Sequence, residues 1–175
     1  NVSDGTVKGC EALLRWASPE GELMLPDTFI YLAEQAGTIV PIGEWVLREA
    51  CSFNKRLVDA GYAEMVMSVN ISVAQLRHSS LVETIKGALE HSGLRPELLE
   101  LEVTESLCIE SFSAAAEILD AIRAIGVRVC LDDFGTGYSS LSYLQSFPFD
   151  KIKIDRVFIC DLEHNQHSRA IVRAV

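Results

Sequence analysis

Apolar residues along this chain follow two patterns that alternate from one end to the other. Short runs rich in Val, Ile and Leu are typical of buried strands, and longer stretches with apolar residues every three or four positions are typical of helices. The pattern predicts strands at residues 7–16, 65–71, 98–104, 127–132 and 150–155. It predicts helices at residues 27–36, 43–60, 79–92, 111–125, 139–146 and 166–175. We expect no hairpin between any two of these strands.

Local signals mark several of the helix ends. Asp27 follows Pro26 and is expected to be the N-cap of the first helix. Gly93 and Gly126 follow two later helices, and glycine is the residue most often found just after a helix C-terminus.

The alternation of strands and helices predicts an α/β fold with a parallel sheet and right-handed crossovers. This order fits either an open doubly wound sheet or a closed (β/α)₈ barrel. A complete barrel usually needs about 250 residues, whereas this chain has 175 residues. The chain starts without Met and stops within a predicted helix. We therefore expect residues 1–175 to be one domain, incomplete at both ends, from a longer protein.

Composition narrows the classes of function. Hydrophobic residues make up 49% of the chain, enough for a substantial core, but every apolar run is shorter than the about 20 residues that span a membrane. We expect no membrane contact from this segment. The formal net charge of −10 argues against binding to duplex nucleic acid, which requires a basic face. An anionic substrate would need metal ions or local Arg and Lys residues to bind.

Cysteine usage indicates the redox compartment. The chain has five cysteines, an odd number, and no two of them form a CxxC pair. A disulfide framework is therefore not expected, and a reducing, cytoplasmic compartment fits best.

Polar residues gather at the carboxyl ends of the predicted strands, where parallel α/β folds carry their functional sites. Carboxylates with one amide oxygen are the ligands that Mg²⁺ and Mn²⁺ prefer. In chain order, the polar strand-end residues and their neighbours on the same face are Glu11, Leu13, Arg15, Asn70, Ser72, Glu102, Thr104, Glu105, Asp132, Asp133, Lys151, Lys153 and Asp155.

These residue types indicate phosphodiester chemistry. The adjacent carboxylates of Asp132 and Asp133 suggest two metal ions, since each can reach a different ion. Two ions about 3.5–4 Å apart stabilise the attacking and leaving oxygens of a phosphodiester displacement. Arg15 can bind a phosphate oxygen. Lys153 can orient or deprotonate a metal-bound water, or neutralise charge in the transition state.

Each of these residues also has a purely structural interpretation. Glu11 and Arg15 can form a surface ion pair, Asn70 can be a turn residue, and the two adjacent aspartates can cap the turn that follows them. The four histidines are dispersed in polar segments and indicate no zinc site. The functional interpretation rests on the coincidence of polar residues at all five strand ends.

Five segments of the chain carry distinctive motifs: CEALLRW, VNIS, LEVTES, LDDFGTGYSSLSYL and FDKIKIDRVFI. In their order and spacing, these segments resemble the EAL domain, the cyclic di-GMP phosphodiesterase family of bacterial signalling proteins. The resemblance implies a modified (β/α)₈ barrel that uses metal ions to hydrolyse cyclic di-GMP to linear pGpG. It implies two ions, either Mg²⁺ or Mn²⁺, with Ca²⁺ as an inhibitor.

The resemblance also assigns roles to individual residues. Lys153 matches a lysine near the nucleophilic water, and Glu11 is expected to take part in catalysis as well as in metal binding. Asp155 is expected close to the substrate, behind the direct ligands. The residues that match metal ligands are Glu11, Asn70, Glu102, Asp132 and, for the second ion, Asp133. The residues that match substrate contacts or line the guanine side of the groove are Leu13, Arg15, Pro26, Phe29, Ala33 and Glu34.

A loop after the fourth predicted strand completes the resemblance. Glu105 matches a glutamate that holds this loop, and the loop contributes to dimer contacts in the family. Its first residues here are Phe134, Gly135, Thr136 and Gly137. The resemblance thus implies a homodimer, regulated by sensor domains elsewhere in the longer protein.

The family carries further strands that this chain lacks. One, with a Gln-Pro motif, precedes the first segment, and two more, with an acidic Glu-Gly motif and a glutamine, follow residue 175. Activity is therefore expected of the longer protein rather than of this segment alone.

Three alternatives stay open at this stage. The first is a receptor of the same fold that binds cyclic di-GMP without hydrolysing it. The second is a module that dimerises and relays a signal. The third is an enolase-type enzyme, which places acids on successive barrel strands around Mg²⁺ and uses a lysine base, although adjacent aspartates suit two metals better than one.

Overall fold

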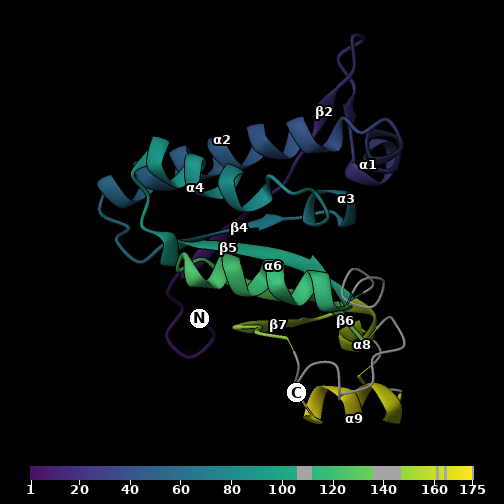
Figure 1. The fold of residues 1–175 in the computed structure, drawn as a ribbon. Coiled ribbons are helices and arrows are strands. Elements are labelled where there is room, and N and C mark those ends of the chain that lie inside the picture. The colour runs from purple at the N-terminus through teal and green to yellow at the C-terminus, as the bar shows by residue number, and fades with distance from the viewer. Residues whose placement is uncertain (106–111, 136–146, 161, 164, 175) are drawn as a thin grey trace.

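The computed structural model describes residues 1–105, 112–135, 147–160, 162–163 and 165–174 (Figure 1). They form a curled five-stranded parallel sheet in the order β1-β4-β5-β6-β7. With helices outside the sheet, this is the incomplete (β/α)₈ barrel that the sequence predicted. The strands are β1 (Gly9–Ala12), β4 (Val66–Asn70), β5 (Leu99–Thr104), β6 (Arg128–Phe134) and β7 (Lys151–Ile154).

Helices cover the outer face of this sheet. The long α2 (Ile39–Asp59) packs beside α4 (Leu81–Ser92), and α6 (Phe112–Ala124) packs against β6 (Figure 1). The remaining helical elements are α1 (Pro26–Gln35), α3 (Val73–Leu76), the 3₁₀ turn η1 (Pro96–Leu98), α8 (Arg156–Cys160) and α9 (Gln166–Ala174).

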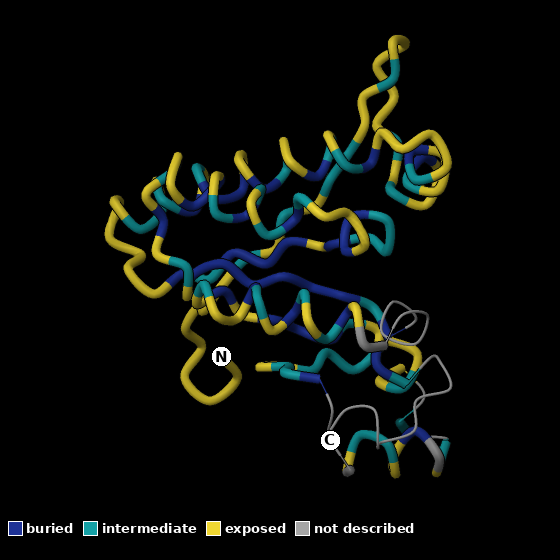
Figure 2. Tube along the Cα trace, in the orientation of Figure 1, coloured by how far each residue is buried: buried dark blue, intermediate teal, exposed yellow. Residues whose placement is uncertain are grey.

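Alternation along the strands separates an apolar from a polar face. On β4 and β5, Val69 and Leu101 face the helices and are almost fully buried, in one core cluster with Leu47 and Ile85. Figure 2 shows that nearly all of β5 is buried. The intervening residues face the barrel interior and are polar. Because paired strands place register partners on the same face, this interior row runs across all five strands and includes Glu11, Ser68, Asn70, Glu100, Glu102, Cys130, Asp132, Lys151 and Lys153.

As expected, the five strands of the main sheet pair only in parallel and no hairpin joins any two of them, but a separate short hairpin was not predicted. The predicted strand 7–16 ends at Ala12, and β2 (Trp16–Ala17) pairs antiparallel with β3 (Leu23–Met24). The turn between them closes through a hydrogen bond from the Ser18 amide to the Glu22 carbonyl, at 2.8 Å. Gly21 has a φ of 88°, a conformation that glycine adopts without strain.

The helix ends follow the sequence signals in part. Gly93 has a φ of 68° after α4, as expected of a C-terminal glycine. The predicted N-cap Asp27 is wrong, because Pro26 is already the first helical residue and Leu25 occupies the cap. The elements α3 and α8 were not predicted, and the helix predicted at 139–146 lies outside the described residues.

A close contact fixes the turn that follows Asn70. Ser72 caps α3 in a capping box with Gln75, which packs against Gly43 of α2. A Cβ at Gly43 would lie 1.8 Å from Gln75 Nε2, so any larger residue there would displace the Gln75 side chain. This packing ties the carboxyl end of β4 to α2.

The described cysteines carry free thiols, at Cys10, Cys51, Cys130 and Cys160. Within the described part of the chain, no helix combines the length and the apolar character needed to cross a bilayer.

Candidate active site

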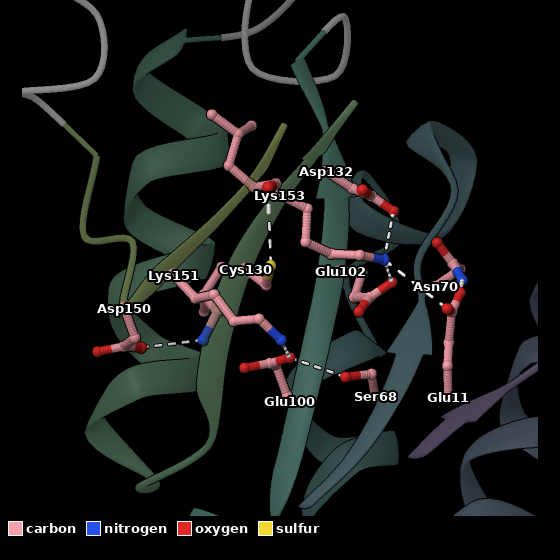
Figure 3. Close-up of polar contacts among 12 residues, drawn as sticks. Glu11, Ser68, Asn70, Glu100, Glu102, Cys130, Asp132, Asp150, Lys151 and Lys153 are labelled. Atoms are coloured by element: carbon pink, nitrogen blue, oxygen red, sulfur yellow. Dashed lines mark hydrogen bonds and ion pairs between the residues drawn. The ribbon is translucent and has the colours of Figure 1, made fainter. Parts of the chain in front are cut away.

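Lys153 lies at the centre of the polar residues at the carboxyl ends of the strands (Figure 3). Its ammonium donates to Glu102 Oε2 at 2.7 Å and to Asp132 Oδ2 at 2.9 Å, and lies 3.7 Å from Glu11 Oε2. These three acids come from β5, β6 and β1. Side chains far apart in the sequence therefore meet because their strands are parallel and end at the same edge.

Asn70 joins the same cluster from β4. Its Nδ2 donates to Glu11 Oε1 at 2.8 Å. The register explains this contact. Glu11 pairs with Ser68, and Asn70 lies two residues further along β4 on the same face. On its other side, Asn70 pairs with Glu102 of β5. We call this cluster the upper layer, composed of Glu11, Asn70, Glu102, Asp132 and Lys153.

Asp133 and Asp155 form a neighbouring acidic pair. Asp133 has a φ of 54°, a conformation uncommon for a residue other than glycine, and its amide donates to Asp132 Oδ1 at 2.9 Å. Its side chain is hydrogen-bonded to Asp155, whose Oδ1 also accepts from the Val157 amide at 2.6 Å. The turn thus places Asp133 beside Asp155, whereas the side chain of Asp132 is directed toward Lys153.

The charges in the upper layer perturb one another. Glu102 is 2% exposed, and burial raises its pKa, although the hydrogen bond and charge of Lys153 oppose the change. Burial opposes the charge on Lys153, but its hydrogen bonds to Glu102 and Asp132 outweigh this and raise its pKa. Burial and the charges of Asp132 and Asp155 raise the pKa of Asp133. Lys153 therefore stays positively charged and neutralises the acids around it.

The donor set of the upper layer fits a hard divalent cation. It offers carboxylate oxygens from three strands and an amide from a fourth, which are the groups that Mg²⁺ and Mn²⁺ prefer. The Lys153 ammonium supplies the neutralising positive charge among them. The ligands predicted from the sequence for the first ion, Glu11, Asn70, Glu102 and Asp132, are brought together.

A second cluster lies one layer further into the barrel, and sequence reasoning missed most of it. Glu100 Oε1 accepts from Ser68 Oγ and from Lys151 Nζ, each at 2.7 Å (Figure 3). We call Ser68, Glu100 and Lys151 the lower layer. The alternation within LELEVT, where Glu100 precedes Glu102 by two residues, places both acids on one face of the strand but does not identify the partners of Glu100.

A cavity of about 560 Å³ adjoins the upper layer beside the ends of β1 and β4. Leu13, Pro26 and Glu34, which were predicted to contact the substrate or to line its guanine side, line this cavity together with Asn70. Their contact with the substrate stays a prediction. Phe29 and Ala33 line a separate apolar cavity on the other side of α1.

Arg15 also lines this apolar cavity, and its Nη1 donates to the Leu14 carbonyl at 2.7 Å. The strand alternation that was expected to orient it beside Glu11 stops at Ala12. Its contact with substrate stays a prediction.

Glu105 is buried beyond the end of β5. Its Oε2 accepts from the amide of Gly135, which follows the buried Phe134. Glu105 thus binds the start of the loop that it was expected to hold. Thr136 and Gly137 lie outside the described residues.

The fold and the site together define a protein of the barrel class, with an acidic, lysine-containing centre at the carboxyl ends of its strands. The chain belongs to the EAL domain family, whose domain matches residues 1–175.

Two similar proteins carry names that state an activity. The chain is 46% identical to the bifunctional diguanylate cyclase/cyclic di-GMP phosphodiesterase MucR of Pseudomonas aeruginosa, over 98% of this chain and 25% of MucR. It is 40% identical to the cyclic di-GMP phosphodiesterase PdeR of Escherichia coli, over 98% of this chain and 26% of PdeR. The chain thus spans about a quarter of these relatives.

A solved structure agrees with the fold. The PaMucR phosphodiesterase in complex with c-di-GMP superposes with a TM-score of 0.92 at 46% identity, over 98% of this chain and 70% of that one.

Proposed function

We propose that the protein containing this chain hydrolyses cyclic di-GMP to linear pGpG. The observation that carries the proposal is the convergence of Glu11, Asn70, Glu102 and Asp132 around Lys153. A receptor that only binds the nucleotide has no need of this constellation. The names of the similar MucR and PdeR proteins, both cyclic di-GMP phosphodiesterases, support the same reaction.

The upper layer would hold the metal. Glu11, Asn70, Glu102 and Asp132 are proposed to bind one Mg²⁺ or Mn²⁺ ion, and Asp133 a second. When bound, such ions polarise the phosphate and activate the attacking water. Ca²⁺ is expected to inhibit, because it is larger and binds with looser geometry.

The chain's own residues would then orient the substrate. The Lys153 ammonium, kept charged by its acidic partners, can balance the negative charge that develops on the phosphate. Leu13 and Pro26, on the cavity beside the upper layer, are proposed to contact the nucleotide. Arg15 is proposed to bind a phosphate oxygen after its side chain turns from the Leu14 carbonyl.

Asp155 would support the substrate site through Asp133, to which it is hydrogen-bonded. This contact would hold the exposed side chain of Asp133 beside the upper layer.

The assembly and setting of the protein are part of the same proposal. We infer a homodimer whose contacts include the loop that begins at Phe134, with Glu105 holding that loop through Gly135. Sensor domains elsewhere in the longer protein would regulate turnover, and the domain would work in the cytoplasm.

The experiment is product analysis by chromatography. The full-length protein that contains this chain is incubated with cyclic di-GMP and Mg²⁺, and formation of pGpG is expected. The Asp132→Asn variant should lose turnover by orders of magnitude, whereas Asp120→Asn on the exposed side of α6 should not. Replacing Mg²⁺ with Ca²⁺ should stop hydrolysis. Binding of cyclic di-GMP without hydrolysis in Mg²⁺ would instead identify a receptor.

A further inference from the structure

The lower layer contains a buried acid that the proposed reaction does not use. Glu100 is 3% exposed and lies on the same face of β5 as Glu102, two residues away. One oxygen of each carboxylate and the Cys130 sulfur all lie within 4.8 Å of one another. Two buried carboxylates this close repel each other strongly unless each has its own cation.

Strand β7 supplies a cation for each acid, at the same two-residue spacing. Lys151 pairs with Glu100 and Lys153 pairs with Glu102, both at 2.7 Å (Figure 3). Cys130 of the intervening strand lies between them, since it is in register with Glu102 on one side and with Lys151 on the other. Its side chain is short, so the lysines reach across β6 to the acids.

Ser68 is the second hydrogen-bond partner of Glu100 within the lower layer. Its hydroxyl donates to Glu100 Oε1, the oxygen that also accepts from Lys151. The Glu100 carboxylate therefore has two partners that are not part of the upper layer, and Lys151 neutralises its charge.

Loss of Lys151 would change this balance. Lys153 would then be the nearest lysine to two buried acids, and its long, flexible side chain can move between them. Any shift toward Glu100 lengthens its contact with Asp132, which is 2.9 Å in the intact site. The upper layer would keep the same residues, but Lys153 would no longer be held in its position beside Asp132.

We propose that Lys151 is a positioning residue, which keeps Lys153 in the upper layer by neutralising Glu100. This inference rests on the proposed hydrolysis of cyclic di-GMP. Lys151 itself is not expected to touch the substrate. Its role depends entirely on the charge of Glu100, and this dependence separates it from a simple contribution to stability.

The test combines Lys151→Met with Glu100→Gln in the full-length protein. The single variant Lys151→Met should lower kcat by roughly 10- to 100-fold with little change in KM, because displacement of a catalytic group by about 1 Å has costs of this size. Adding Glu100→Gln removes the competing charge and should restore most of kcat. Glu100→Gln alone should have a small effect. Lys55→Met, which removes a lysine from an ion pair on α2, is the matched control.

A merely structural role predicts a different pattern. The double variant would then be no more active than Lys151→Met, and that result, or unchanged kcat in Lys151→Met, would overturn the inference. Thermal unfolding of each variant shows whether it is folded at the assay temperature. If the unmodified protein does not hydrolyse cyclic di-GMP, the proposed function fails. Crystal structures of the variants then still test the positioning role of Lys151. The contact between Lys153 and Asp132 should be broken in Lys151→Met and present in the double variant, and an intact contact in Lys151→Met would refute the positioning role.

Discussion

The ammonium of Lys153 lies 2.7 Å from the carboxylate of Glu102, a side chain almost completely buried in the barrel. The same ammonium contacts Asp132 and is 3.7 Å from Glu11. A divalent cation bound by these acids would use carboxylate oxygens that contact the ammonium in this structure, so metal and lysine would neutralise the same charges. In the absence of metal, Lys153 therefore stabilises the site.

Replacement of Lys153 by Met should destabilise the metal-free protein. The change leaves Glu102 buried without a cation, which costs about 3–5 kcal/mol for a fully buried pair. Lys153 is 31% exposed, so a smaller loss is expected. Added Mg²⁺ or Mn²⁺ should raise the melting temperature of the variant more than that of the unmodified protein. Thermal unfolding in EDTA and in metal measures both effects, and an equal metal response in the two proteins would show that lysine and metal do not compete.

The contribution of Lys153 to stability should depend on pH in a defined direction. Its pKa is raised in the folded protein, so the stabilisation is fully present below the unfolded-state pKa of about 10.4 and is lost as pH rises through the folded pKa. In EDTA, the stability difference between the protein and Lys153→Met should be constant from about pH 6 to 9 and shrink above about pH 10. A difference that already falls near pH 7 contradicts this picture.

Two glycines in helices should respond oppositely to alanine. A Cβ at Gly43 would lie 1.8 Å from the Gln75 side chain, whereas a Cβ at Gly87 of α4 meets nothing within 4 Å. Gly43→Ala should destabilise by about 1–3 kcal/mol through overpacking. Gly87→Ala should raise the free energy of unfolding by about 0.5–1 kcal/mol, because alanine has a higher helix propensity than glycine. Urea unfolding of both variants tests the pair, and a neutral Gly43→Ala would mean that Gln75 moves freely.

Thiol reactivity should separate the cysteines. Burial raises the pKa of Cys51 and of Cys130 to about 12, whereas Cys160 is exposed on α8. The thiolate is the reactive form, so Cys130 should react slowly with an aromatic disulfide reagent in the native protein. The Cys160→Ser variant should lose one fast-reacting thiol, and Cys130→Ser should lose none. Rapid reaction at Cys130 would show that the barrel interior opens readily.

The convergence of the site could be predicted from the sequence because it needs only strand order and alternation. Asn70 and Glu102 each lie near the end of an apolar run, and parallel strands bring such ends to one edge. The hairpin formed by β2 and β3 was missed because each strand has only two residues, too few for an alternating pattern.

The lower layer could not be predicted for a different reason. In the sequence, Glu100 looks like the polar half of a half-exposed strand. Its burial is tolerable only because Lys151, 51 residues later, neutralises it. Such a pairing depends on which strands flank β6 and on the small size of Cys130, and neither follows from the pattern around Glu100 itself.

The central claim is that side chains from separate strands share divalent cations. Anomalous diffraction at the manganese edge, from crystals of the full-length protein grown with Mn²⁺, tests it most directly. We predict one Mn²⁺ ion bound by Glu11, Asn70, Glu102 and Asp132, and a second bound by Asp133. One ion alone would favour an enolase-type centre. Mn²⁺ bound elsewhere, or none in a protein that still hydrolyses cyclic di-GMP, would contradict the account.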